Sequence, residues 1–359
     1  MKALKQHKFK PISTTILKIL FAIQGTGNGH LSRARDIYPE LAKYGEVDVL
    51  ISGIQADVAV PFPVKYKMYG MSFIFGKRGG VDILATTRRL KLFQLLRDIR
   101  NFPIEQYDLV INDFEPVSAW ACKRKNLPCI SLSHQCAVLT PHAPKPAAGD
   151  PMGKLVLERY APVTAAYGFH FKAFDENIFT PVIRQEIRKL TPTNEGHYTV
   201  YLPAYDDATM VKHFSHFPNV RWQVFSKHNK EAFTTGNVSV QKINNEAFIK
   251  SMASSAGVLC GAGFEGPAEA MHLGKKVLVI PMLTQYEQQC NAAGAAVMGA
   301  TVIKTLSEKY YAVIGDWLQN GKPIVVDYKD ITASIIKDLI TKHTPTPKTK
   351  LYETAAVPA

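Results

Sequence analysis

Cysteine is scarce in this sequence, and the patterns that would give it a special role are missing. The five cysteines are scattered along 359 residues, and none forms a Cys-x-x-Cys pair or stands in a zinc-ligand spacing. These absences argue against a disulfide-rich secreted scaffold and a zinc module, and they favour a reducing, cytoplasmic compartment. Long apolar runs are missing as well. No stretch reaches about 18 apolar residues, so the sequence predicts no membrane-spanning helix.

The N-terminal segment lacks the features of a secretory signal. Its lysines lead into residues 16–23, an apolar run that is too short for a secretory core and has no cleavage site after it. What the sequence has in excess is positive charge, a formal +13, which suits nucleic acid, an acidic membrane face or a phosphorylated substrate. We expect no nucleic-acid partner, because no recognisable nucleic-acid-binding module accompanies the charge.

The chain is long enough for two domains of average size. Apolar strands and amphipathic helices alternate along it in two rounds, which predicts an α/β fold with parallel sheets covered by helices. The predicted strands are residues 16–23, 47–51, 109–112 and 129–132, then 198–202, 220–225, 238–241, 257–260 and 277–280. We place one domain at 14–180, a linker within 171–197, a second domain at 181–342 and a disordered tail at 343–359.

The first glycine-rich loop, residues 24–30, stands between a predicted strand and a helix that Gly45 is placed to stop. Such a loop lets the backbone approach a ligand, and the helix behind it offers free N–H groups. The dinucleotide-binding fingerprint does not fit, because His30 replaces its third glycine. Asp48 also lies inside the second strand rather than after it, so a dehydrogenase is disfavoured.

His30 is the sharper feature of this loop. It stands at the carboxyl end of the first strand, where open α/β sheets bind their ligands, and histidine is the usual general base near neutral pH. Asp113 ends a later strand, and if the two strands are neighbours it can orient the His30 imidazole. Glu115 is the alternative partner. The plainer interpretations are a packing or capping histidine and an aspartate that starts a turn.

A second glycine-rich segment, residues 261–269, follows an apolar strand and opens a helix. Gly261 and Gly263 permit a tight turn, and Pro267 suits the first helical position, so the segment predicts a diphosphate site at a helix N-terminus. Glu269 could accept two hydrogen bonds from a ribose. The plainer alternative is a capping box, although the expected cap residue would be Gly266 rather than Ser or Thr.

Polar side chains gather again after the strand at 277–280, in the segment Glu287-Gln288-Gln289-Cys290-Asn291. Its carboxylate and amides could bind several sugar hydroxyls at a strand's carboxyl end. The alternative is an ordinary solvated helix start.

The two loops together resemble the GT-B superfamily of nucleotide-sugar glycosyltransferases. The similarity is greatest to the UDP-dependent transferases and to the lipid-linked N-acetylglucosaminyltransferase of peptidoglycan synthesis. Residues 25–30 are similar to that enzyme's glycine-rich loop ending in His. Gly263 and Glu269, six residues apart, match the spacing in which the glutamate holds the ribose. Residues 287–292 are similar to the Asp-Gln-x-x-Asn-Ala motif that contacts the donor sugar.

The resemblance implies two Rossmann-like domains facing across a cleft, with the acceptor on the first and the donor on the second. It implies donor-binding residues Gly261, Gly263, Phe264, Glu265, Gly266, Glu269, Glu287, Gln288 and Ile243, and acceptor-side residues Gly27, Asn28, Gly29 and His134. Two positions depart from the family pattern. Gly261 stands where plant-type members carry a His that touches the diphosphate, and Glu287 replaces the usual Asp.

The resulting hypothesis is an inverting transfer in which His30, oriented by Asp113, deprotonates an acceptor hydroxyl. The expected donor is a nucleotide sugar, with UDP as the nucleotide. Neither a metal nor another cofactor is expected, in keeping with the absence of an Asp-x-Asp motif. Two alternatives stay open: a nucleotide-sugar 2-epimerase of the same architecture, and a non-catalytic protein that binds a sugar nucleotide or a lipid.

The acceptor is not defined by any motif. A basic amphipathic helix at 84–100 and an aromatic loop at 66–75 could dock on an anionic membrane face, which would suit a lipid-linked acceptor and a location at the inner face of the membrane. The alternative is a surface helix that packs its leucines into the fold.

Overall fold

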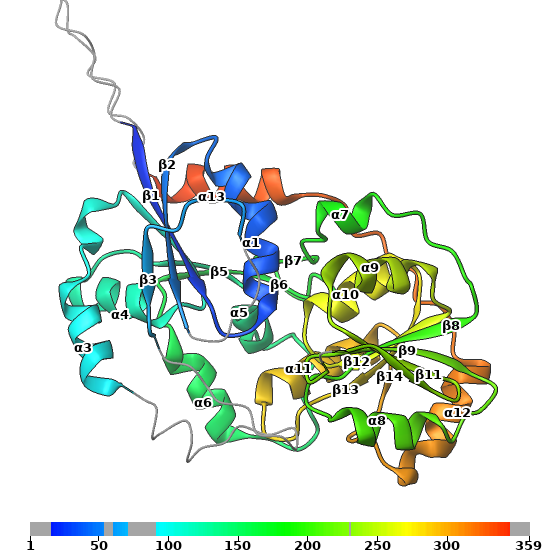
Figure 1. Ribbon diagram of the computed structural model, residues 1–359. Coiled ribbons are helices and arrows are strands. Elements are labelled where there is room, and N and C mark those ends of the chain that lie inside the picture. Colours follow the sequence, from blue (N-terminus) through cyan, green and yellow to red (C-terminus); the bar gives the residue numbers. More distant parts are fainter. Residues whose placement is uncertain (1–15, 54–59, 71–90, 230, 345–359) are drawn as a thin grey trace, which may run out of the picture.

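A computed structural model describes residues 16–53, 60–70, 91–229 and 231–344, and it contains two seven-stranded sheets (Figure 1). The first sheet has the order β3-β2-β1-β4-β5-β6-β7, and all its strand pairs are parallel. Its strands are β1 (Leu17–Gln24), β2 (Gly45–Ser52), β3 (Tyr66–Met68), β4 (Leu109–Asp113), β5 (Ile130–Ser133), β6 (Ala165–Phe169) and β7 (Ile178–Phe179).

The second sheet has the order β10-β11-β9-β8-β12-β13-β14, and only the edge strand β10 runs antiparallel to its neighbour. Its strands are β8 (His197–Tyr201), β9 (Arg221–Ser226), β10 (Phe233–Thr235), β11 (Val238–Lys242), β12 (Gly257–Gly261), β13 (Lys276–Ile280) and β14 (Thr301–Val302). The predicted α/β class, with one architecture used twice, is confirmed.

Helices connect the strands on both sides of each sheet. In the first domain they are α1 (Asn28–Leu41), α3 (Leu92–Asn101), α4 (Pro116–Lys125), α5 (His134–Leu139) and α6 (Pro151–Tyr160). After the short α7 (Gln185–Arg188), the second domain has α8 (Asp207–Phe214), α9 (Asn245–Ser254), α10 (Glu265–His272), α11 (Tyr286–Val297) and α12 (Tyr311–Asn320). The last helix described is α13 (Thr332–His343).

From Ile19 to Ile23 the sequence of β1 is a continuous apolar run and does not alternate between apolar and polar residues. Ile19 and Phe21 pack with the α1 side of the sheet, whereas Leu20 and Ala22 pack with the α4 side. Both faces are covered, so neither set of alternate residues needs to be polar. Because β1 is an inner strand that lies between β2 and the central strand β4, its carboxyl end lies near the centre of the sheet edge.

Two local expectations were wrong. Gly45 does not stop a helix but begins β2, where a Cβ would collide with the backbone of Leu17 in the neighbouring strand. The aromatic loop expected at 66–75 begins with the edge strand β3, which is too short to show an alternating pattern. The range 171–197, within which the linker was expected, contains β7, which pairs with β6 in the first sheet, and the short helix α7.

The end of the chain returns to the first domain. Helix α13, which falls within the range expected for the second domain, packs against α1 (Figure 1). The Tyr167 hydroxyl contacts Nε2 of His343, the last residue of this helix, at 2.9 Å. The predicted disordered tail lies, from residue 345 onward, outside the described residues. Within the described ranges, no helix combines the length and apolar character needed to cross a bilayer.

Candidate active site

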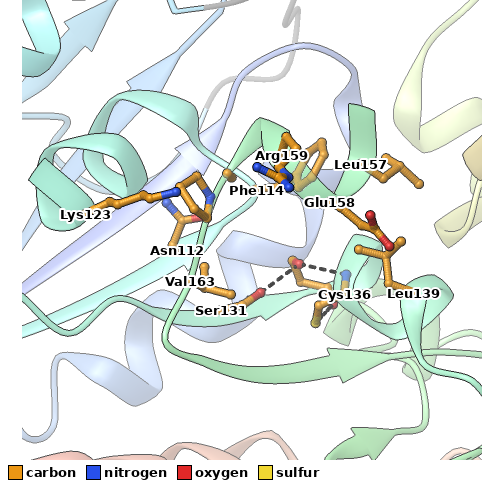
Figure 2. Close-up of a pocket in the computed structure, with 13 residues that line it drawn as sticks. Asn112, Phe114, Lys123, Ser131, Cys136, Leu139, Leu157, Glu158, Arg159 and Val163 are labelled. Carbon is orange, nitrogen blue, oxygen red and sulfur yellow. Dashed lines mark hydrogen bonds between the residues drawn. The ribbon is translucent and has the colours of Figure 1, made fainter. Parts of the chain in front are cut away.

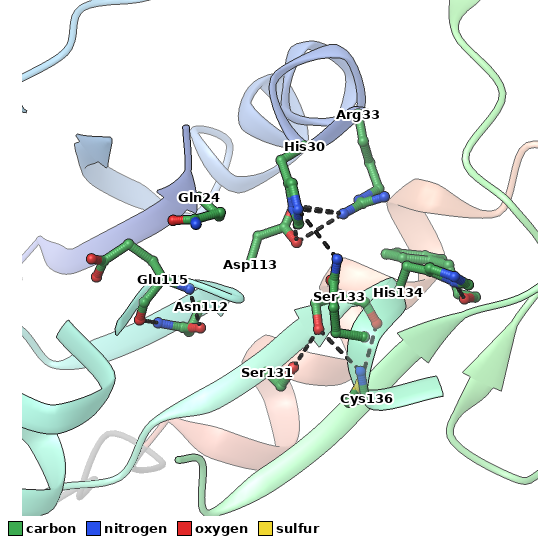
Figure 3. A network of polar contacts seen from close by, with 12 residues as sticks. Gln24, His30, Arg33, Asn112, Asp113, Glu115, Ser131, Ser133, His134 and Cys136 are labelled. Atoms are coloured by element: carbon green, nitrogen blue, oxygen red, sulfur yellow. Dashed lines mark hydrogen bonds and ion pairs between the residues drawn. The ribbon is translucent and has the colours of Figure 1, made fainter. Parts of the chain in front are cut away.

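The first glycine loop and β4 bring His30 and Asp113 together. Strands β1 and β4 are neighbours, with Ile23 opposite Asp113, so the expectation about these strands is confirmed. Gly27 caps α1 with a φ of 94°, a value that favours glycine, and Asn28 begins the helix. His30 then points down at the end of β4, where its Nδ1 lies 2.9 Å from Oδ1 of Asp113 (Figure 3).

Arg33 completes this pair and was not predicted. It lies one helical turn after His30, and its Nη2 donates to both carboxylate oxygens of Asp113 at 2.8 Å (Figure 3). Its side chain is only 1% exposed, and its Nη1 donates to Glu265 of the second domain. The signal that could have found it is the i, i+3 spacing from His30, which puts both side chains on one helix face.

Burial and ion pairing act on this cluster in opposite directions. Burial lowers the pKa of His30, but the charge and hydrogen bond of Asp113 outweigh it and raise that pKa above 6.5. Burial raises the pKa of Asp113, but the charges of Arg33 and His30 outweigh it and hold that pKa below 3.8. Asp113 is therefore an anion at neutral pH, and it favours an imidazole that accepts a proton.

Glu115 is not the partner of His30. It caps α4, and its carboxylate accepts hydrogen bonds from the backbone N–H groups of Val117 and Ser118 and from the hydroxyl of Ser52. Asp113 likewise does not act as a turn or cap residue, because it is the last residue of β4 and is fully buried. The plainer interpretation of Asp113 was therefore wrong.

The second glycine loop runs from Gly261, the last residue of β12, to α10. The helix begins at Glu265, two residues before Pro267, so the expected start at the proline was wrong. Nothing lies within 4 Å of the position that a Cβ would take at Gly263 or Gly266, so this side of the loop is open. The amino end of α10 faces the first domain, because Glu265 pairs with Arg33 there.

Glu269 has a partner that the sequence did not reveal. It is the fifth residue of α10 rather than the third, and its two oxygens accept hydrogen bonds from Nε and Nη2 of Arg184 at 2.5 and 2.8 Å. The capping-box alternative is therefore wrong. Nη1 of Arg184 also donates to Asn245, the first residue of α9, 2.8 Å away. Ile243 lies two residues before that asparagine, and its backbone N–H donates to the carbonyl of Ser226.

The segment that begins with Glu287 forms the first turn of α11. Glu287 accepts a hydrogen bond from Nε2 of Gln135 at 3.2 Å, and the same amide nitrogen lies 3.3 Å from Nε2 of His30. Gln288 accepts a hydrogen bond from the backbone of Met282. Gln135 was missed by the sequence analysis, and it joins the first turn of α11 to the free side of the His30 ring.

His134 lies between the domains. Its Nε2 contacts Oδ1 of Asn291 at 2.6 Å, its Nδ1 contacts the carbonyl of Phe169 at 2.7 Å, and its ring stacks on Phe264 with centroids 3.9 Å apart. The side chain is buried, and it connects the start of α5 to Asn291 of α11 and to Phe264, the residue before α10. Its assignment to the acceptor side stays a prediction.

Two cavities border these elements. One of about 310 Å³ opens beside the ends of β4 and β5, with the polar side chains of Ser131 and Cys136 and the apolar Leu139 and Leu157 in its wall (Figure 2). The other, of about 540 Å³, lies along the outer side of α1, where Arg184 is part of its wall. In the part of the chain that the structure describes, no three His, Cys, Asp or Glu side chains are grouped as a metal site requires.

Comparison with solved structures identifies the fold. The solved structure of the glycotransferase of kitacinnamycin has a TM-score of 0.58 and 13% identity, over 92% of this chain and 100% of that one. A UDP-glucosyltransferase from Polygonum tinctorium has a TM-score of 0.55 and 13% identity, over 92% and 95%. A UDP-N-acetylglucosamine 2-epimerase has a TM-score of 0.53 and 14% identity, over 91% and 97%. These likenesses identify the GT-B fold.

A comparison with curated proteins finds no match. The family model for glycosyl transferase family 1, in contrast, matches residues 17–320, which cover both sheets and both glycine loops. The protein is therefore a glycosyltransferase that belongs to glycosyl transferase family 1.

Proposed function

We propose that this glycosyltransferase moves a sugar from a UDP-linked donor to an acceptor hydroxyl, with inversion and without a metal. The observation that carries the proposal is the position of the His30–Asp113 pair opposite the open loop at the start of α10, to which Arg33 and Glu265 connect it. A base and an anion-binding helix end thus face each other from different domains. UDP is chosen because residues 261–269 resemble the loops of UDP-dependent transferases.

The donor rests on the second domain in this proposal. Its diphosphate lies over residues 261–266, where two glycines leave the backbone open and the α10 dipole favours negative charge. Glu269 is the expected ribose partner. Since both of its oxygens bind Arg184 in this structure, the ribose must either use the remaining acceptor positions of the carboxylate or displace the guanidinium.

The chemical step uses both domains. Asp113 holds Nδ1 of His30, which leaves Nε2, the nitrogen near Gln135, to take the proton of the acceptor hydroxyl. The hydroxyl oxygen then attacks the anomeric carbon from the side opposite the leaving diphosphate, so the configuration inverts. The helix end stabilises the negative charge that develops on the diphosphate, a role that a metal ion plays in other enzymes.

We propose that the acceptor enters from the first domain. The cavity of about 310 Å³ beside β4 and β5 offers hydroxyl groups, an apolar wall and, on its exposed rim, the cations Lys123 and Arg159 with the carboxylate of Glu158 (Figure 2). Such a lining suits an acceptor with an apolar body and an anionic group.

Contact with an anionic membrane is part of the same proposal. On α3, Leu95 is buried, whereas Leu92, Phe93 and Leu96 are 52%, 89% and 54% exposed, so the leucine face only partly packs into the fold. Residues 71–90, which include the first part of the predicted basic helix, lie outside the described residues. The protein should sediment with vesicles that contain phosphatidylserine and not with phosphatidylcholine vesicles, and equal binding to both would contradict the electrostatic contact.

A panel of nucleoside diphosphates tests the donor assignment. A ligand that binds only the folded state raises its stability, by about 2.7 kcal/mol when present at 100 times its Kd. We therefore expect UDP to raise the melting temperature more than ADP, GDP or CDP. No shift with any diphosphate would reject the donor site. Conversion of a UDP sugar without any acceptor would instead identify a 2-epimerase, the activity of one protein with the same fold.

A further inference from the structure

The carboxylate of Glu265 lies where positive charge converges in this structure. Glu265 is the first residue of α10, so its carboxylate is close to the positive end of that helix. It also packs on the first turn of α1, where a Cβ at Gly29 would collide with it. Nη1 of Arg33 binds it from the side. Two helix ends and a guanidinium therefore surround one anionic group.

Neighbouring carboxylates would repel an incoming diphosphate at this place. Three carboxylates belong to the cluster: Asp113 of β4, Glu265 of α10 and, through Gln135, Glu287 of α11. The permanent cation among these groups is Arg33. A diphosphate placed over residues 261–266 therefore needs Arg33 as its counter-charge, because helix ends alone supply only about half an elementary charge each.

Arg33 has the freedom to serve two partners. Nη2 holds Asp113 within the first domain, whereas Nη1 reaches across to the second domain. Its Nε is buried and has no hydrogen-bond partner in the described structure, so the guanidinium has a donor still to satisfy. Glu265, in contrast, is 23% exposed, so its side chain can swing into solvent when it loses this partner.

We propose that Arg33 binds the donor diphosphate, which takes the place of the Glu265 carboxylate, while Arg33 keeps its two hydrogen bonds to Asp113. The inference rests on the proposed function and assigns this residue a role in it. Arg33 then contacts the leaving group and, through Asp113, the base. The Arg33 side chain therefore couples binding of the donor to the position of His30.

Paired binding measurements with UDP and uridine test this role, since the two ligands differ by the diphosphate alone. In Arg33→Met we expect the Kd for UDP to rise at least tenfold and the Kd for uridine to stay unchanged. Arg33→Lys, which keeps the charge, should retain most of the UDP affinity. Arg35→Met is the matched control, because Arg35 lies on the same helix with 37% of its side chain exposed, and it should alter neither Kd.

Glu265→Gln tests the same idea without removing the buried cation. It deletes the competing carboxylate, so we expect UDP to bind about tenfold more tightly and uridine to bind as before. Weaker UDP binding in this variant, or an equal loss of UDP and uridine affinity in Arg33→Met, would overturn the inference. If the wild-type protein binds none of the diphosphates, the proposed function fails; if it binds UDP and these variants leave the UDP-to-uridine ratio unchanged, only the role of Arg33 fails.

Discussion

Replacing His30 with alanine is expected to lower turnover roughly 10²–10⁴-fold, the contribution of a positioned general base. The imidazole is 11% exposed, its Nδ1 is held by Asp113, and its Nε2 is the nitrogen left for an acceptor proton. Turnover is measured as release of the nucleoside diphosphate with a saturating acceptor. Binding of UDP should change little, because no donor contact in the proposal uses this ring.

The matched control is His142→Ala, since His142 has a side chain that is 70% exposed and pairs only with Asp175 at 3.1 Å. That variant should keep wild-type turnover. The pH profile gives a second readout. The base must be neutral to accept a proton, so kcat/KM should rise with pH through the His30 pKa, which lies above 6.5. Asp113→Asn should move this rise in kcat/KM to lower pH. Burial and the charge of Arg33 lower the pKa of His30, and the variant lacks the carboxylate that raises it. Near-normal turnover in His30→Ala would remove the residue from the role.

Replacing Arg184 with methionine is expected to destabilise the protein by about 3–5 kcal/mol, the cost of leaving one member of a buried ion pair without its partner. Glu269 is 3% exposed and uses both oxygens to bind Arg184, so in the variant a buried carboxylate has neither water nor a cation. The free energy of unfolding in urea measures the loss.

The control for this change is Lys250→Met, which removes an exposed pair with Glu246 on α9 and should leave stability unchanged within error. The double variant Arg184→Met/Glu269→Leu should regain much of the loss, because it removes the unpaired charge along with its partner. If Arg184→Met costs no more than Lys250→Met, the bond between linker and helix is not a stabilising feature.

Much of the fold followed from local patterns. The apolar runs of β1, β12 and β13 are short and fully covered, and each glycine loop interrupts the pattern at the carboxyl end of a strand. Adjacent parallel strands end at the same edge, so His30 and Asp113 were expected to meet if their strands were neighbours, and the pairing of β1 with β4 meets that condition.

The remaining site residues could not be predicted in this way. Arg33 meets a residue 232 positions away, and Arg184 meets one 85 positions away. From the sequence alone, an arginine on a helix or in a polar linker is expected to be solvent-exposed, because its acidic partner is not close to it along the chain. Gln135 is similar, since its contact with Glu287 depends on how the two domains face each other. The local sequence pattern predicts which strands and helices form a sheet, but it does not predict which side chains meet between the two domains.

The return of α13 to the first domain determines how the two halves can move. The polypeptide passes between them twice, once near α7 and once before α13, and these passages are bonded to each other. Gln185 donates to Asp330 at 2.6 Å, and Arg188 donates to the carbonyl of Tyr328 at 2.7 Å. If one chain segment joined the domains, they could rotate about that segment. Because two hydrogen-bonded segments join them, we expect rotation to be resisted and hinge bending to be the easier motion. Such bending would separate Arg33 from α10 and bring them together again in the same relative orientation.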